Sequence, residues 1–227
     1  SSFQLDRSYF LSPASAAVLN ITSDHMDRYP SSDAYAESKF RIFKNMTSPS
    51  KCLIRSDLAD YWRRFAGRSG WPLTFSGGDP SADYHSNASL DIIRRRSGRD
   101  EVLFSAAGAQ LKGPHNVENM LAAVALVLAA VPGADIAKIA AAACAFKAGE
   151  HRLQVVSSCN GVTYINDSKA TNPDSVVAAL KTVGGEKNVC LIGGGLDKDM
   201  DFSPILGEKD KIKAIFIVGE CKNKLAS

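Results

Sequence analysis

Residues 162–192 read VTYINDSKATNPDSVVAALKTVGGEKNVCLI, and this stretch decides the fold. Its apolar, β-branched start predicts a strand over Val162–Ile165, which ends in the polar loop Asn166–Asn172. A helix is predicted from Pro173 to Thr182, since Pro is tolerated in a first turn. The next strand is predicted over Asn188–Ile192. A strand, a helix and another strand in this order are typical of a parallel α/β sheet.

The residues on either side extend this pattern. Leu153–Ser157 predicts a strand that pairs with the one beginning at Val162, because Asn160-Gly161 between them is a strong hairpin signal. A last strand is predicted over Ala214–Val218. The texture of the sequence changes after Arg152, so we divide the chain into domains 1–152 and 153–227. The second domain is short for an α/β unit and lacks later strand-helix pairs.

The first domain also alternates strands with helices, which again indicates the α/β class. The predicted elements are strands over Ala16–Ile21 and Lys51–Arg55, short strands around Leu73, Ile92 and Val102–Phe104, and helices over Asp33–Met46, Leu58–Ala66, His115–Val131 and Ile136–Phe146.

The composition limits the function classes. The 227 residues carry 27 Lys and Arg against 24 Asp and Glu, and 45% are hydrophobic. A disordered or fibrous chain is thereby excluded. The net charge of +3 gives little attraction to nucleic acid or to an anionic membrane. The densest basic cluster, Arg94–Arg96, is expected to be a solvated surface rather than a phosphate-binding patch.

The cysteines and the apolar runs indicate the compartment. The five cysteines form no CxxC pair and have no histidine at zinc-finger spacing, so neither a disulfide framework nor a structural zinc is expected. The longest apolar run, Met120–Val131, has 12 residues, fewer than the roughly 20 that cross a bilayer. We expect a reduced, soluble, cytoplasmic protein, with a monomer favoured.

Two ionisable residues in the first domain attract attention. Lys39 falls in the middle of the apolar face of its predicted helix. It either snorkels from the edge of that face or sits inside, where an ammonium must be neutralised, paired or chemically modified. His25 follows a predicted buried strand, between Asp24 and Asp27, at a sheet edge where α/β proteins place ligands. A lone histidine can equally be structural.

Three polar groups open the Ala-rich helix. His115, Asn116 and Asn119 are spaced by three and four residues, so all three can share one patch near the helix N-terminus. Asn is a common cap, which explains one of them and not all three.

Two polar loops follow strands of the second domain. The loop Asn166–Asn172 comes after His151-Arg152 along the chain, and Gly193–Lys198 follows the next strand. Each loop holds an isolated lysine among hydroxyl and amide groups, a setting that suits anionic substrate groups. The glycine loop matches neither GxGxxG nor the P-loop pattern, so alone it is a weak signal.

Taken together, these segments resemble the Mur ligases, and among them the branch that adds D-glutamate. The resemblance spans nearly the whole chain. It rests on SSFQL at 1–5, LNIT and DHMDRY at 19–29, HNxxN at 115–119, HR at 151–152 and NDSKATN at 166–172. SSFQL and NDSKATN are the specific strings, since sister ligases and folylpolyglutamate synthetases carry other residues there.

The resemblance implies a fold and a reaction. The fold would be a central domain, with a parallel sheet, flanking helices and a small accessory antiparallel sheet, followed by a truncated Rossmann-like domain. The reaction would be the ATP-dependent addition of D-glutamate to UDP-N-acetylmuramoyl-L-alanine through an acyl phosphate, in peptidoglycan precursor synthesis, with Mg²⁺ neutralising phosphate charge.

The resemblance also implies residue roles. His25 would be a magnesium ligand and Lys39 a carbamylated lysine facing the metal. The nucleotide would contact residues of the motifs that match the family, namely Asn116, Asn119, Arg152, Asp167 and Lys169. Substrate and D-glutamate would contact Ser2, Gln4, Thr171 and Lys198, with Lys169 facing phosphate or D-glutamate.

Departures from the family pattern are large. The chain lacks the phosphate loop GxxGK(S/T), the metal-binding glutamate before SSFQL and the domain that binds the uridine nucleotide. It also stops before the loop expected to complete the D-glutamate pocket. We therefore expect a piece of a longer protein, inactive alone.

Two other hypotheses stay open. The first hypothesis makes the chain part of the D-glutamate-adding ligase. The second makes it a non-catalytic nucleotide-binding or interaction module of the same fold, and the third makes it part of a Mur ligase for another amino acid. An upstream phosphate loop would separate the first two, and substrate-swap assays would identify the third.

Overall fold

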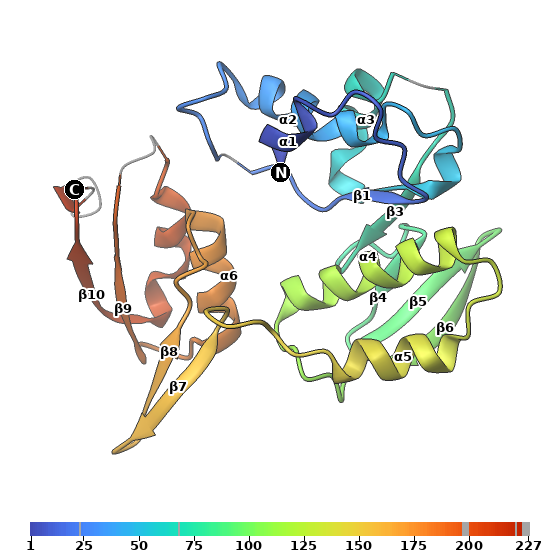
Figure 1. The fold of residues 1–227 in the computed structure, drawn as a ribbon. Coiled ribbons are helices and arrows are strands. Elements are labelled where there is room, and N and C mark those ends of the chain that lie inside the picture. Colours follow the sequence, from blue (N-terminus) through green and yellow to red (C-terminus); the bar gives the residue numbers. More distant parts are fainter. Residues whose placement is uncertain (23, 68, 197–199, 221, 224–227) are drawn as a thin grey trace. The chain divides into compact units, whose positions relative to one another are not determined.

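The computed structural model describes residues 1–22, 24–67, 69–196, 200–220, 222 and 223. They fall into two compact units. The first combines residues 1–21 with Pro30–Phe146, and the second combines the loop 22–29 with the described residues from Lys147 onward. Each unit has its own strands and helices (Figure 1).

The first unit is built on one six-stranded sheet with its strands in sequence order. The first four strands are parallel, and the last two are antiparallel. The antiparallel strands expected as a small accessory sheet are therefore joined to the parallel ones through β4, a strand the sequence analysis missed. The strands are β1 (Ala16–Val18), β2 (Cys52–Arg55), β3 (Leu73–Ser76), β4 (Tyr84–Ser86), β5 (Asp91–Arg96) and β6 (Arg99–Ser105).

Helices and strands of this unit begin and end close to the predicted positions, with one correction to a helix and one to a strand. The helix expected over Asp33–Met46 is α2 (Ser32–Phe40) followed by a 3₁₀ turn, η1 (Arg41–Phe43). The tighter turn brings Phe43 edge-on to Phe40 and to Trp62, at ring-centroid distances of 5.7 and 5.4 Å. The strand expected over Ala16–Ile21 is paired only as far as Val18. The other helices are α1 (Ser2–Leu5), η2 (Pro49–Lys51), η3 (Ser56–Leu58), α3 (Ala59–Phe65), α4 (Pro114–Ala130) and α5 (Ile136–Ala145).

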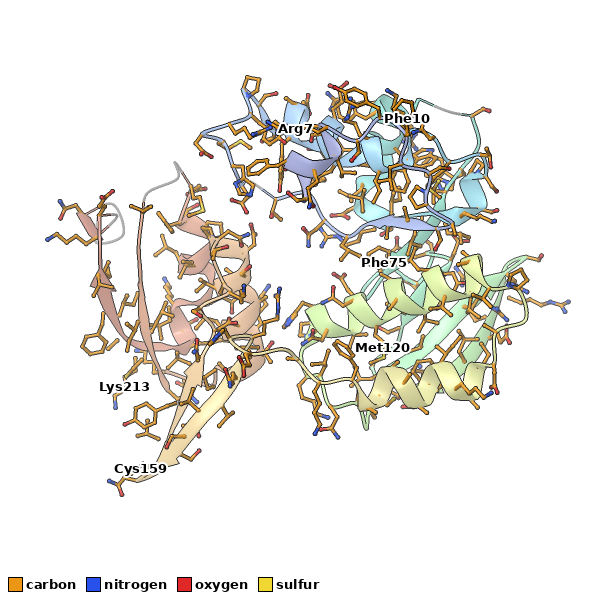
Figure 2. All side chains as sticks on the ribbon, viewed as in Figure 1. Arg7, Phe10, Phe75, Met120, Cys159 and Lys213 are labelled. Carbon is orange, nitrogen blue, oxygen red and sulfur yellow. The ribbon has the colours of Figure 1, made fainter. Side chains whose placement is uncertain are left out.

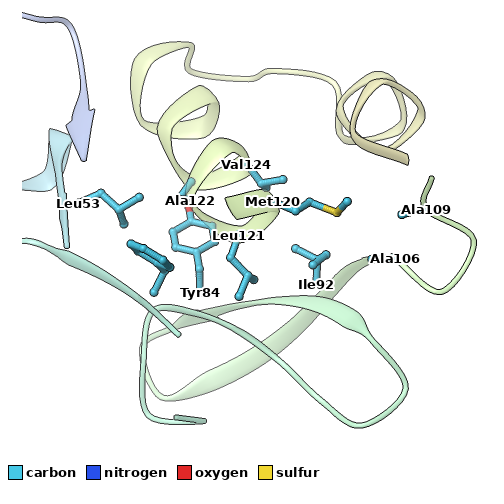
Figure 3. Packing of buried hydrophobic residues seen from close by; sticks show 11 residues of the cluster. Leu53, Tyr84, Ile92, Ala106, Ala109, Met120, Leu121, Ala122 and Val124 are labelled. Carbon is cyan, nitrogen blue, oxygen red and sulfur yellow. The ribbon is translucent and has the colours of Figure 1, made fainter. Parts of the chain in front are cut away.

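Two apolar clusters hold the first unit together. One lies between the sheet and α4, where Leu121 and Val124 are almost fully buried against Tyr84 and Ile92 (Figure 3). Burial of the ring raises the pKa of the Tyr84 phenol. The other cluster joins α2, η1 and α3 to the parallel strands around Phe40, Phe43, Ile54 and Trp62. Each such side chain contributes about 1.5–3 kcal/mol when fully buried.

The second unit contains a hairpin and a parallel pair of strands. The hairpin is β7 (Gln154–Cys159) with β8 (Val162–Asn166), and its turn residues have φ of 52° and 76°, as the Asn-Gly signal predicted. Cys159 lies at its tip (Figure 2). The parallel pair is β9 (Val189–Gly194) with β10 (Ile212–Val218), and the remaining elements are α6 (Pro173–Val183) and η4 (Ser203–Lys211).

One prediction for this unit was wrong. We expected β8 and β9 to be neighbours in one parallel sheet, but among the described residues they belong to two separate two-stranded sheets. The left-handed backbone at Asn160 and Gly161 folds β8 back on β7, so one edge of β8 pairs with a strand that is close in sequence.

Two predictions about the surface are answered. In the part of the chain that the structure describes, we find no helix with the length and apolarity needed to cross a bilayer. The basic cluster on β5 is neutralised in part, since Arg94 pairs with Glu101 and Arg95 with Asp100 across the β5–β6 ladder. Arg96 is exposed as expected, whereas Arg94 and Arg95 are half-buried along the ladder.

Candidate functional site

The first turns of α4 present the amide groups that the sequence singled out. Gly113 precedes the helix with a φ of 96°, and Pro114 occupies the first turn. Asn116 donates through Nδ2 to the carbonyl of Lys112 at 2.8 Å, and Asn119 donates to Asn116 Oδ1 at 3.4 Å. No side chain caps this helix. Capping therefore explains neither asparagine, and both amides stay on one patch near the helix N-terminus.

An acidic residue missed by the sequence analysis anchors this patch. Glu118 Oε1 lies 3.4 Å from the backbone nitrogen of Gly77, which donates to it, just after β3. Glu118 Oε2 lies 3.6 Å from Arg55 Nη1 at the end of β2. The signal was present: Glu118 is the single charged side chain among the 17 residues of α4.

Arg55 is itself held from the other side. Its guanidinium makes two hydrogen bonds to the Asp57 carboxylate, at 2.6 and 2.7 Å. These bonds raise the pKa of Arg55 above its ordinary value, burial opposes the shift, and Glu118 adds to it. The α4 amides thus lie near the carboxyl ends of parallel strands, where open α/β sheets bind ligands.

Lys39 lies on α2 in a half-buried position. Its Nζ is 4.8 Å from the centroid of the Tyr35 ring, a cation–π contact. The helix face around it carries buried aromatic and small residues, as the periodicity predicted. The contact is compatible with both alternatives for Lys39, since it stabilises an ammonium but does not bury it completely.

The SSFQL segment forms the short helix α1 and packs on α2. The Ser38 hydroxyl donates to Asp6 Oδ1 at 2.6 Å and lies 3.2 Å from the Ser2 carbonyl. Ser2 is 5% exposed, whereas Gln4 is exposed. Of the two predicted substrate contacts in this segment, Gln4 presents the more accessible side chain.

In the second unit, the NDSKATN loop is tied to the His-Arg segment by several hydrogen bonds. Asp167 Oδ1 accepts the Leu153 N–H at 3.0 Å, and Asn166 Nδ2 lies 3.0 Å from His151 Nδ1. The Lys169 N–H donates to the His151 carbonyl at 3.2 Å. His151 and Leu153 hold left-handed φ angles of 64° and 44°, a strain typical of functional segments.

The charged groups of this loop face solvent. Arg152, Lys169 and Thr171 are exposed, and Asp167 is half-buried. The cap of α6 is Asn172, whose Oδ1 accepts the Ser175 N–H at 2.9 Å. Asn172, and not the neighbouring Thr171, therefore caps this helix.

The loop 22–29 reaches the same region of the second unit. Asn172 Nδ2 donates to Asp24 Oδ2 at 3.5 Å, and Asp24 Oδ1 accepts the His25 N–H at 2.9 Å. His25 has a left-handed φ of 58°. The structure thus brings Asp24 and His25 together with Asn172, whereas Lys39 belongs to the other unit.

The glycine loop has a packing explanation. At Gly194, which has a φ of 144°, an added Cβ would lie 1.8 Å from the Val218 carbonyl oxygen, so only glycine fits beside β10. Lys198, predicted to face D-glutamate, lies outside the described residues.

A metal centre is not assembled by the described residues. Among them, no three His, Cys, Asp or Glu side chains lie close enough together to hold a metal ion. Asp24 and His25 form a pair, with Oδ1 3.8 Å from Nδ1. A hard cation such as Mg²⁺ prefers several oxygen ligands, so this pair alone does not fit it.

Two family models match the chain. One, described as the Mur ligase middle domain, covers residues 1–127. The other, described as the Mur ligase glutamate ligase domain, covers residues 151–226.

Curated relatives and solved structures agree with these matches. The whole chain is 36% identical to the UDP-N-acetylmuramoylalanine–D-glutamate ligase of Geotalea uraniireducens and 35% identical to that of Lachnoclostridium phytofermentans. It spans 49% of the length of each, about half. The MurF structure from Acinetobacter baumannii superimposes with a TM-score of 0.65 at 19% identity, over 90% of this chain and 51% of that one. MurF from Thermotoga maritima in complex with ADP gives 0.63 at 18% identity, over 91% and 48%. These structures support the fold alone.

Proposed function

We propose that this chain, which belongs to the Mur ligase family, is part of an enzyme that joins D-glutamate to UDP-N-acetylmuramoyl-L-alanine with ATP. The observation that carries the proposal is the 33–36% identity, over essentially the whole chain, to curated relatives named as this ligase. The SSFQL and NDSKATN strings support the same amino acid. We place the reaction in the cytoplasm, as part of peptidoglycan precursor synthesis, and expect a monomer.

The chemistry takes two steps. A carboxylate oxygen of the alanine attacks the γ-phosphorus of ATP, forming an acyl phosphate and releasing ADP. The amine of D-glutamate then attacks the acyl carbon, loses a proton and expels inorganic phosphate. An activated acyl group is needed because a carboxylate is a poor electrophile, and the enzyme must hold both anions against their repulsion.

Each unit, taken by itself, offers groups suited to a nucleotide. Asn116 and Asn119 offer amides on one patch of α4, suited to the adenine edge or the ribose. Arg152 and Lys169 offer exposed cations for phosphate oxygens. Asp167 is half-buried, and one of its oxygens is already used by the Leu153 N–H. Its second oxygen is then available for a ribose hydroxyl.

The D-glutamate side would use Thr171 and Lys198, with the muramoyl substrate at Gln4 and Ser2. Thr171 supports this role because it is exposed and does not cap α6. Cations are required here because two carboxylates of the incoming amino acid must be neutralised.

Mg²⁺ would enter with ATP, and bound there it would neutralise phosphate charge. We propose His25 as one of its ligands, and we propose separately that Lys39 is carbamylated to an anionic group. Asp24 Oδ1 accepts the backbone N–H of His25 and so helps to fix the backbone at this residue. The remaining oxygen ligands would come from the nucleotide, from water and from other parts of the enzyme, because the described residues supply too few.

The proposal is tested by ADP release from the full-length enzyme that contains this chain. ATP is supplied with UDP-N-acetylmuramoyl-L-alanine and either D-glutamate or L-glutamate. In separate reactions the acceptor is UDP-N-acetylmuramoyl-L-alanyl-D-glutamate with L-lysine or meso-diaminopimelate, or UDP-N-acetylmuramoyl-L-alanyl-D-glutamyl-meso-diaminopimelate with D-alanyl-D-alanine. We expect sustained release with D-glutamate only. Release with another amino acid instead would identify a sister ligase, and none with any would favour a non-catalytic module.

A further inference from the structure

We propose that Glu118 is a positioning residue, which holds the amide patch of α4 in register with the ends of β2 and β3. This inference rests on the proposed nucleotide contacts of Asn116 and Asn119, since Glu118 acts through them. All the groups involved belong to the first unit.

The first step concerns the helix itself. α4 begins without a side-chain cap, so its first N–H groups lack the partner that normally stops a helix end from fraying. The amides of Asn116 and Val117 both donate to the Gly113 carbonyl, at 3.1 and 3.3 Å, so one backbone oxygen serves two donors of the first turn. The turn that carries the asparagines therefore needs support from outside the helix.

The second step identifies that support. Glu118 lies between the two asparagines in sequence, and its carboxylate bridges two strand ends: the Gly77 N–H after β3 and the Arg55 guanidinium of β2. Asp57 fixes Arg55 by a bidentate pair and so orients it toward Glu118. The carboxylate is 29% exposed, so water screens it only in part.

The third step is the tight packing at Gly77. A Cβ placed there would lie 3.3 Å from Glu118 Cγ, closer than ordinary contact, and 3.9 Å from the Ser86 hydroxyl. Gly77 has no left-handed φ, so alanine is sterically allowed by the backbone itself. The methyl group added by Gly77→Ala should therefore displace the Glu118 side chain. The two substitutions can be combined in a double-mutant cycle.

The experiment uses steady-state kinetics of the full-length enzyme with ATP and D-glutamate varied in turn. Glu118→Ala should raise the KM for ATP about tenfold, the effect of one lost charge-assisted hydrogen bond on the patch. kcat and the KM for D-glutamate should each change by less than about twofold. Glu118→Gln keeps an oxygen for the Gly77 N–H and should restore most of the ATP affinity.

The cycle and a matched control sharpen the result. Gly77→Ala should raise the KM for ATP in the parent enzyme but leave it unchanged in the Glu118→Ala background. Glu101→Ala removes a comparable partner of an arginine, since Glu101 on β6 lies 2.6 Å from Arg94 on β5, and should leave the KM for ATP unchanged.

Amide hydrogen exchange gives a readout that does not need activity. In Glu118→Ala the amides of Asn116 and Val117 should exchange about tenfold faster, because the turn opens more often. If exchange is unchanged, or if the variants lower Tm while the KM for ATP stays constant, Glu118 is only a structural residue and the inference is wrong. If the parent enzyme turns over no ATP at all, the proposed function fails, and the exchange result still decides whether Glu118 holds the turn.

Discussion

Lys39 illustrates how one residue can satisfy two accounts until its chemistry is tested. The contact of its Nζ with the Tyr35 ring stabilises the folded chain by about 0.5–2 kcal/mol. This contact explains why a lysine is tolerated at the edge of an apolar helix face. It gives no reason for a role of Lys39 in catalysis. The modified form proposed above would make the same position anionic.

Replacing Lys39 separates the two accounts. In the full-length enzyme, Lys39→Ala should abolish most ligation, and a short carboxylate such as formate should restore part of it by filling the vacated anionic position. Tm and kcat are measured together. Near-normal kcat with a lowered Tm would mean that the cation–π contact is all that Lys39 provides.

Thr171 makes a second prediction at this scale. Its hydroxyl is exposed, and Asn172 already caps α6. Thr171→Val should therefore leave Tm unchanged and raise the KM for D-glutamate about tenfold, through the loss of a hydrogen bond to a carboxylate. The KM for ATP serves as the internal control, and an equal rise in both constants would contradict a specific role.

At the scale of elements, the junction between α6 and η4 depends on a buried carboxylate. Glu208 is 8% exposed and pairs with Lys211 at 2.6 Å and with Lys181 on α6 at 3.6 Å. The Lys211 hydrogen bond is the main cause that lowers the pKa of Glu208 below its ordinary value of 4.5, although burial opposes the shift. The ionised form is thus favoured by folding.

The lowered pKa of Glu208 makes the free energy of unfolding depend on pH. Because the folded pKa lies below the unfolded one, the pair stabilises the protein above pH 4.5, and that contribution is lost as the pH falls through the lowered pKa. Urea unfolding of Glu208→Gln and parent chains should differ at pH 7 and converge at lower pH. Glu186→Gln, at an exposed position, is the control. A difference that stays constant with pH would contradict the ion pair's role.

The elements also show what the sequence could predict. Helices with strong periodicity, such as α4, α5 and α6, lie within a residue or so of the predicted bounds. The three-residue β4 was missed because Tyr84, His85 and Ser86 carry too short a pattern to separate from a loop. The β7–β8 pairing was predicted from two turn residues, whereas the neighbours of β8 depend on contacts that no local pattern encodes.

The site shows the same division. His-Arg and NDSKATN were recognised as motifs, and the structure joins them through Asp167 and Asn166. Glu118 and Arg55 were missed because their meaning depends on a meeting between a helix and two strand ends. A single charge in an otherwise apolar helix was the sequence signal available.

At the scale of the whole molecule, the chain spans about half the length of its curated relatives. Its sequence contains no GxxGK(S/T) segment, the pattern whose backbone N–H groups bind the β and γ phosphates of ATP. The isolated 227 residues should therefore form no UDP-N-acetylmuramoyl-L-alanyl-D-glutamate. Mass spectrometry of the nucleotide product checks this, and product above the enzyme-free control would overturn it.

The fate of one oxygen atom tests the central claim most directly. UDP-N-acetylmuramoyl-L-alanine labelled with ¹⁸O in its carboxylate is incubated with the full-length enzyme, ATP and D-glutamate, and the inorganic phosphate is analysed by mass spectrometry. An acyl phosphate passes one carboxylate oxygen to phosphate when the amine attacks, so each phosphate released should carry one ¹⁸O, and only when D-glutamate is present. Unlabelled phosphate, or labelled phosphate formed with another amino acid and not with D-glutamate, would contradict the account.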